Sequence, residues 1–301
     1  MVAERGLRAL GARSRRRGPP PAVFVLLAPA CVMFAIFVIF PIIQSLWLSL
    51  QDWDGVGVPR WVGFANFAEL VGDPGFWVAL RNNMLWLLGS SLAPAIGLGL
   101  ALFLNQTVRG IRVIRALFFA PFVISQVVVG LVFAWFFHAE FGLLDAALRR
   151  LGLQPLALLA HEELSIIAVI TASLWPQAAY CTILYLTGLM SLRPEMIEAA
   201  RVDGAGGWAL LWDIVIPALR PVTFIVAMVC VVGAMRSFDL VVIMTGGGPY
   251  GQSSVLAHYM YEQVFLASRH GYGAAVAAVL FAVMGACVGL FLWRLLRGER
   301  A

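Results

Sequence analysis

The sequence contains no arrangement of residues typical of an enzyme active site. His161-Glu-Glu-Leu-Ser165 lacks the second histidine of the HExxH zinc motif, and no GxSxG segment occurs. All 21 basic residues are arginine, so no lysine can form a Schiff base or reach the phosphates in a GxxxxGK[ST] loop. The four cysteines lie in apolar stretches without CxxC or Cys/His spacing, which indicates neither a disulfide framework nor a metal site. We therefore expect no catalysis and no resident cofactor or metal in this chain.

Polar side chains inside long apolar segments are the remaining candidates for chemistry. Such groups are costly in a membrane and tend to face a helix bundle or a cavity. Gln126 and Gln177 occur in two of these segments, and Tyr180 lies about one helical turn from Gln177. The two amides could hydrogen-bond sugar hydroxyls, with Tyr180 as a stacking partner. Alternatively they hydrogen-bond neighbouring helices, and this is the interpretation we favour.

Arg236 and Asp239 are a second kind of polar candidate, because both are charged and both interrupt an apolar run. They are three residues apart, so they can pair on one face of a helix. We favour a structural ion pair over contact with a solute. Arg236 would matter directly for a solute that carries a phosphate group, since arginine binds phosphate through charge-assisted hydrogen bonds.

Residues 191–217 form an amphipathic connection between two apolar runs. Pro194 suits the first helical position, and Glu195 and Glu198 complement the positive end of the helix dipole. Gly204 can adopt the left-handed conformation that ends many helices. These signals predict a short helix over 194–203.

A second amphipathic helix is predicted from Gly207 until Pro217 breaks it, with apolar residues three or four apart on one face. A helix–turn–helix of this kind could fill a groove on another protein. It could equally rest on lipid headgroups, and the residues alone do not separate the two interpretations.

The elements that must position these residues are membrane-spanning helices. Apolar residues make up 61% of the 301, charged residues only 12%, and the mean hydropathy is +0.89. Soluble domains carry about 25% charged residues, so a soluble globular protein is excluded. The arginines lie between apolar blocks rather than on one face, which argues against nucleic-acid binding.

Six runs are long enough for the roughly 20 helical residues that cross a hydrocarbon core. Barrel strands are excluded because the runs are too long and lack apolar/polar alternation. We therefore predict an all-α polytopic fold. The six spans are 22–50, 84–104, 116–137, 164–190, a fifth that opens near Ala218, and 272–293.

Arginine positions predict the orientation of these spans. With the N-terminus inside, fifteen arginines lie on the cytoplasmic side, five outside and one within the fifth span. Both termini are therefore expected in the cytoplasm. Residues 1–21 form an arginine-rich cytoplasmic segment, and 22–301 form one transmembrane domain with the 191–217 loop on the inner side.

The segment Glu198-Ala-Ala-Arg-Val-Asp-Gly204, followed by Ile216-Pro217, resembles the EAA loop of membrane-spanning subunits of bacterial ATP-binding-cassette importers. The match covers the fixed positions of that motif. Other segments resemble the carbohydrate-uptake branch of this family, and the chain looks like the permease type with an FD…GGP segment. These segments are Trp61-Val-Gly-Phe-Ala-Asn-Phe67, Asn82-Asn83, Phe238-Asp239, Met244-Thr-Gly-Gly-Gly-Pro249 and Gly271-Tyr-Gly273.

The resemblance implies a permease subunit of the bacterial inner membrane. Such a subunit pairs with a second permease subunit, contacts membrane lipid and receives a sugar, an oligosaccharide or a glycerol-phosphate-like solute from an extracytoplasmic binding protein. ATP and Mg would be bound by a separate cytoplasmic ATPase dimer, into which the EAA loop docks.

The resemblance also implies roles for single residues. Glu198 would meet a basic group on the ATPase, and Ala199 and Ala200 would permit close approach. Gly204 would form the turn, Asp203 would belong to the residues that couple to the ATPase, and Pro217 would fix the start of the fifth span.

The main alternative is an ion-coupled secondary transporter that needs no ATPase. Transporters of that class tend to show internal repeats and intramembrane carboxylates. Asp239 is the only carboxylate in a predicted span, and no internal repeat is visible. Both observations favour the importer subunit.

Overall fold

The structure is a computed structural model that describes residues 21–106 and 108–298. The arginine-rich segment expected over 1–21 therefore falls almost entirely outside the described residues. The chain divides into two compact units, one up to Trp47 and one from Leu48 onward. The described part of the first unit is helical, with α2 (Pro21–Phe34), the π-helical turn η1 (Ala35–Ile39) and most of α3 (Phe40–Leu48). Leu26–Leu48 is long and apolar enough to cross a membrane.

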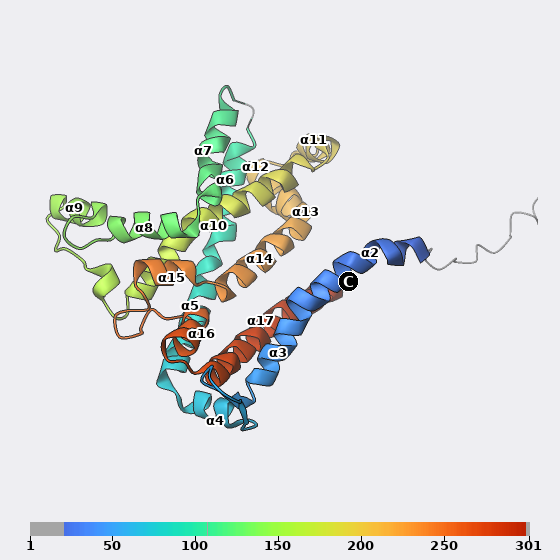
Figure 1. The fold of residues 1–301 in the computed structure, drawn as a ribbon. Helices are drawn as coiled ribbons and strands as arrows, with labels where there is room; N and C mark the ends of the chain where they lie inside the picture. Colours follow the sequence, from blue (N-terminus) through green and yellow to red (C-terminus); the bar gives the residue numbers. More distant parts are fainter. Residues whose placement is uncertain (1–20, 107, 299–301) are drawn as a thin grey trace, which may run out of the picture. The chain divides into compact units, whose positions relative to one another are not determined.

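The second unit is built almost entirely from helices (Figure 1). Its described strands are the short antiparallel pair β1 (Gln51–Asp52) and β2 (Arg60–Trp61). The first half contains α4 (Ala65–Gly72), α5 (Pro74–Ser90), α6 (Leu92–Leu104), α7 (Ile111–Val123), α8 (Gln126–Phe136), α9 (Leu143–Arg150) and η2 (Leu158–Ala160). The second half contains α10 (Ser165–Met190), α11 (Pro194–Val202), α12 (Gly207–Ala209), η3 (Leu210–Val215), α13 (Ile216–Ala218), α14 (Arg220–Met235), α15 (Asp239–Met244), α16 (Leu256–Tyr261), η4 (Glu262–Leu266) and α17 (His270–Gly298).

Four helices in the described residues could each cross a membrane: Leu26–Leu48, Pro74–Leu104, Ser165–Met190 and His270–Arg294. Two further spans exist if bent helix pairs count as one each, namely α7 with α8, and Gly207–Ala218 with α14. The bends are 96° and 68°. The structure therefore holds four to six spans, which agrees with a polytopic helical membrane protein.

The structure differs from the predicted spans in three places. The second span begins at Pro74 rather than Met84, because the single charge of Arg81 does not end the helix. The third run is not one straight helix, since Ile124 and Ser125 are extended and Ser125 caps α8. The fifth run is helical only to Met235, so Asp239 begins a separate helix.

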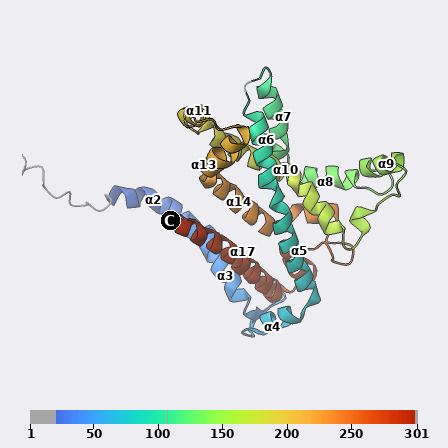
Figure 2. The same ribbon diagram turned by 180° about the vertical axis from the view of Figure 1, so that it is seen from behind.

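Helix α10 is the central element of the second unit, and α5, α6, α7, α14 and α15 all pack on it (Figures 1 and 2). The approach of α6 is close, because a Cβ atom on Gly97 would lie 2.5 Å from the Cβ atom of Cys181. Small residues permit such close contact between membrane helices. The close packing of α10 on α6 therefore depends on the absence of a side chain at Gly97.

Asp73 connects α5 to the helices at the other end of the chain. It accepts hydrogen bonds from the Gly75 N–H (2.9 Å), from the Tyr272 hydroxyl (2.5 Å) and from the Tyr259 hydroxyl. Partial burial raises the pKa of the Asp73 carboxyl, but the hydrogen bonds to its charged form outweigh this and lower the pKa overall. Burial and the hydrogen bond to Asp73 raise the pKa of Tyr259 to about 12.

The lowered pKa of Asp73 predicts a pH-dependent contribution to stability. The carboxylate stabilises the folded state fully above its ordinary pKa, and this stabilisation is lost as the pH falls through the lowered folded value. Asp73→Asn is therefore expected to lower the thermal midpoint at pH 7, with the gap to wild type narrowing at acid pH. Midpoints of the purified protein measured between pH 7 and pH 3 check this. Glu162→Gln, at an exposed carboxylate, is the control. A difference in midpoint between wild type and Asp73→Asn that stays constant with pH would contradict a stabilising role of the charged Asp73 carboxylate.

Candidate functional site

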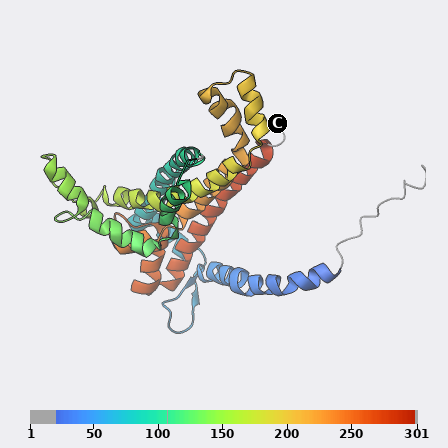
Figure 3. The same cartoon turned by 90° about the horizontal axis from the view of Figure 1, so that it is seen from above.

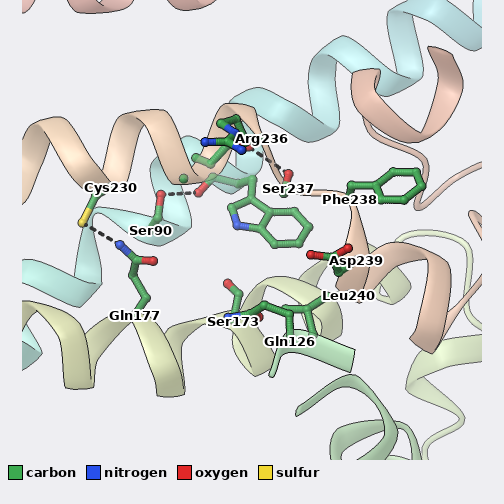
Figure 4. A pocket seen from close by; sticks show the side chains of 13 residues that line it. Ser90, Gln126, Ser173, Gln177, Cys230, Arg236, Ser237, Phe238, Asp239 and Leu240 are labelled. Atoms are coloured by element: carbon green, nitrogen blue, oxygen red, sulfur yellow. Dashed lines mark hydrogen bonds between the residues drawn. The ribbon is translucent and has the colours of Figure 1, made fainter. Parts of the chain in front are cut away.

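A polar cavity of about 190 Å³ lies where α5, α8, α10, α14 and α15 meet (Figure 4). Its lining combines one cation, one carboxylate, two amides, three hydroxyls and two aromatic side chains. The lining residues are Trp86, Ser90, Gln126, Ser173, Gln177, Cys230, Gly233, Ala234, Arg236, Ser237, Phe238, Asp239 and Leu240.

Helix breaks bring these side chains to the cavity. Ser125 accepts a hydrogen bond from the Val128 N–H (3.4 Å) and so starts α8, whose first residue is Gln126. A break of three residues follows Met235, and this non-helical link presents Arg236 at the cavity. Broken helices in membrane proteins commonly border a cavity, because their free backbone groups need partners.

Each serine hydroxyl of the cavity donates a hydrogen bond to a backbone carbonyl three or four residues earlier in the chain. Ser90 Oγ donates to the Trp86 carbonyl (2.8 Å), Ser173 Oγ to the Ile170 carbonyl (2.6 Å) and Ser237 Oγ to the Ala234 carbonyl (2.8 Å). A hydroxyl that donates in this way keeps its oxygen lone pairs as acceptors. The cavity can therefore accept hydrogen bonds at the serines and donate them from Arg236 and the glutamines.

Four of the five polar or aromatic candidates that the sequence singles out line this one cavity: Gln126, Gln177, Arg236 and Asp239. Gln177 also makes an interhelical contact, because its Nε2 donates to Cys230 Sγ at 3.3 Å. Tyr180 does not line the cavity. Its ring stacks on Phe122 instead, with ring centroids 4.9 Å apart.

The predicted ion pair between Arg236 and Asp239 is wrong. The described residues form four ion pairs, and this is not among them. Spacing of three residues brings side chains together only on a continuous helix. Here the helix ends at Met235. Both residues are exposed, and their side chains lie apart in Figure 4.

Two adjacent asparagines, which form part of the family resemblance but are not among the predicted site residues, brace this region. Asn83 is fully buried, donates to the Ala234 carbonyl (3.1 Å) and accepts from the Leu256 N–H (2.7 Å). Asn82, also fully buried, donates to the carbonyls of Gln252 and Ser254 at 2.6 and 2.8 Å. Asn83 thus connects α5 to a cavity-lining residue of α14 and to the first residue of α16.

The helix–turn–helix predicted in the connection between α10 and α14 is present, and we refer to residues 194–218 as the EAA hairpin. Helix α11 covers Pro194–Val202, one residue shorter than predicted. It ends in a Schellman motif, in which the Ala205 N–H bonds the Ala200 carbonyl (2.9 Å) and the Gly204 N–H bonds the Arg201 carbonyl (3.1 Å). Gly204 has φ +86°, as this motif requires.

The motif residues differ in exposure. Glu198, Ala199 and Asp203 are exposed, whereas Ala200 is only 9% exposed and lies within the hairpin, where α11 packs on η3. Only one of the two alanines is therefore available at the hairpin surface. Large apolar side chains of the hairpin are exposed as well, with Val202 87%, Trp208 73% and Trp212 60% exposed.

Pro217 does not end the second helix of the hairpin. The helical segment runs through it to Ala218, and the axis turns by 68° at the buried Leu219 before α14 begins. The hairpin stands at the end of the bundle where α10 finishes and α14 starts, and it projects beyond these helices in the view of Figure 3.

The fold and the cavity define a multi-helix membrane protein with a polar space between its helices. Residues 93–298 match the family described as the binding-protein-dependent transport system inner membrane component. The chain belongs to this family. It is accordingly the permease subunit of an ATP-binding-cassette importer, a transport subunit rather than an enzyme.

Curated relatives cover nearly the whole chain. A probable ABC transporter permease protein of Pyrococcus horikoshii is 34% identical over 94% of this chain and 99% of its own length. The sulfoquinovosyl glycerol transport system permease protein SmoG of Agrobacterium fabrum is 30% identical over 91% of this chain and 89% of its own. The sn-glycerol-3-phosphate transport system permease protein UgpA of the same species is 30% identical over 87% and 90%.

A solved structure shares the fold. A bacterial ABC transporter involved in the import of the acidic polysaccharide alginate superposes with a TM-score of 0.81. It covers 92% of this chain and 95% of its own at 23% sequence identity. A second structure of a bacterial alginate transporter, in complex with a periplasmic protein bound to alginate pentasaccharide, gives a TM-score of 0.78.

Proposed function

We propose that this chain forms half of the pathway of an importer for a sugar, an oligosaccharide or a glycerol-phosphate-like solute, and that the EAA hairpin couples it to a cytoplasmic ATPase. The other half is a second permease subunit, an extracytoplasmic binding protein supplies the solute, and the ATPase dimer holds ATP and Mg. The chain crosses the inner membrane six times with both termini in the cytoplasm, and its outer helices contact lipid.

One observation carries this proposal: the exposed EAA hairpin and the polar cavity share the helices α10 and α14. The hairpin follows α10 directly and continues through Leu219 into α14. Gln177 on α10 and Cys230 on α14 line the cavity. A force on the hairpin therefore reaches the cavity wall along two rigid helices, as an alternating-access change driven by ATP requires.

The hairpin has the form of a compact docking element. Helix α11 has nine residues, which corresponds to about 14 Å at 1.5 Å per residue. One of its two exposed carboxylates, Glu198, stands beside the exposed small residue Ala199 and the apolar Val202. A helix with an acidic group and an apolar edge suits a groove with a basic group on its wall.

Co-purification tests this function. The tagged protein is extracted from its native membrane in mild detergent, and the proteins that accompany it are identified by mass spectrometry. We expect a second permease and a P-loop ATPase, with the ATPase lost when residues 194–204 are replaced by a glycine-serine linker. Recovery of this chain alone, or as a homodimer, would contradict the proposal and favour an ion-coupled secondary transporter.

Arg236 bears on the solute class, because no carboxylate pairs with it among the described residues. The names of two relatives, for sn-glycerol 3-phosphate and sulfoquinovosyl glycerol, specify solutes that combine hydroxyls with an anionic group. The cavity offers a guanidinium with amides and hydroxyls, beside the single carboxylate of Asp239. We infer that Arg236 binds the anionic group of the solute.

Arg236→Gln is expected to raise the KM for uptake about 10- to 150-fold, since losing one charge-assisted hydrogen bond costs about 1.5–3 kcal/mol. Uptake by the intact complex is measured with sn-glycerol 3-phosphate and with sulfoquinovosyl glycerol. Arg150→Gln, at an exposed arginine of α9, is the control and should leave the KM unchanged. An unchanged KM in Arg236→Gln would rule out the anion-binding role, whereas no uptake of either solute by wild type would exclude these two solutes.

A further inference from the structure

Two of the four cysteines meet beside the cavity. Cys181 on α10 and Cys230 on α14 have their Sγ atoms 3.7 Å apart, although 49 residues separate them in the chain. Both are free thiols, and their exposed fractions are 1% and 4%. A disulfide bond is about 2.05 Å long, so the sulfur atoms need to approach by about 1.6 Å.

The cavity gives access to one thiol of the pair. Cys230 lines the cavity, where Gln177 Nε2 donates a hydrogen bond to its Sγ atom and holds it at the wall. Cys181 lies behind it and is backed by α6, whose main chain approaches at Gly97. A small neutral reagent in the cavity therefore reacts with Cys230 first, and Cys181 is the second thiol, which then closes the disulfide.

The two cysteines lie on the helices that flank the EAA hairpin, so a bond between them would restrain the hairpin. A bond between the two sulfur atoms would close a ring that contains the end of α10, the whole EAA hairpin and the start of α14. The two helices on either side of the hairpin could then no longer change their packing. Packed helices switch between discrete arrangements rather than deforming continuously, so such a bond holds one arrangement.

We propose that Cys181 and Cys230 form a modification site that a small neutral two-electron oxidant converts into a disulfide, tying α10 to α14 and arresting transport. Each thiol loses one proton and one electron as the S–S bond forms. With an azodicarboxamide as oxidant, the N=N bond takes up both electrons and both protons and becomes a hydrazine. The arrest of transport rests on the proposed function, whereas formation of the disulfide does not.

The test uses the co-purified complex in proteoliposomes and diamide as the azodicarboxamide. After blocking free thiols with N-ethylmaleimide, peptide mass spectrometry should find Cys181 linked to Cys230. ATP hydrolysis should fall about tenfold, because the tied helices cannot interconvert, and dithiothreitol should restore it. Cys181→Ala should hydrolyse ATP at the rate of the untreated native complex, with or without diamide. In Cys31→Ala and Cys287→Ala, diamide should still lower the rate of ATP hydrolysis.

Each outcome has one meaning. Absence of the linked peptide in diamide-treated native protein, when the unfolded protein does form it, overturns the modification site. A linked peptide with undiminished ATP hydrolysis overturns the arrest of transport. Loss of the sensitivity to diamide in Cys31→Ala or Cys287→Ala overturns it as well. A purified complex without any ATPase subunit contradicts the proposed function instead, and peptide mapping still decides whether the thiols react.

Discussion

Reversing the charge of Glu198 is expected to abolish uptake while the subunit remains at normal abundance. Glu198 is exposed on α11 and makes no ion pair within the described residues, so its removal costs the fold little. Surface substitutions away from such contacts usually change stability by less than about 0.5 kcal/mol. In the complex, Glu198→Lys would place two cations together at the docking surface. Losing one partner of a buried charge pair costs about 2–5 kcal/mol, enough to release the ATPase.

The matched control for Glu198→Lys is Asp213→Lys. Asp213 is an exposed carboxylate in the same hairpin but lies outside the EAA motif. Uptake, subunit abundance in the membrane and recovery of the ATPase with the tagged subunit are measured for both variants. We expect the ATPase to be lost only in Glu198→Lys. Transport that survives Glu198→Lys at normal abundance would show that this residue has no coupling role.

Local signals in the sequence predicted the EAA hairpin closely. Pro194 at the helix start and Gly204 after its end are backbone requirements that act over a few residues, so they can be read without knowing the fold. The same kind of signal was available for the bend between α7 and α8. Ser125 is a capping residue in a largely apolar run, and it marks where the third run breaks.

The membership of the cavity was only partly predictable. Glutamine and charged residues stand out in an apolar run, and four of these proved to line one space. Serine does not stand out, because a hydroxyl in a membrane helix commonly bonds its own backbone, as Ser90 and Ser173 do. The contact between Cys181 and Cys230 depends on which helices are neighbours, and helical periodicity carries no such information.

Asn83→Ala is expected to be the most destabilising of the substitutions considered for this chain. Leu256 is the first residue of α16, and no carbonyl of its own helix can accept its N–H. Asn83 Oδ1 accepts that hydrogen bond in a fully buried position. Leaving the N–H without a partner costs about 1–3 kcal/mol. The Ala234 carbonyl loses less, because Ser237 Oγ still donates to it.

The thermal midpoint of the purified subunit measures this loss. At about 2–4 °C per kcal/mol for a protein of this size, Asn83→Ala should lower the midpoint by about 2–12 °C. Asn105→Ala makes the same change at an exposed asparagine after α6 and should leave the midpoint within about 1 °C. Because Asn83 also holds Ala234 at the cavity wall, transport should fall in Asn83→Ala even at temperatures where it stays folded. An unchanged midpoint would show that water or a backbone shift satisfies the Leu256 N–H, and that α5 does not brace the cavity.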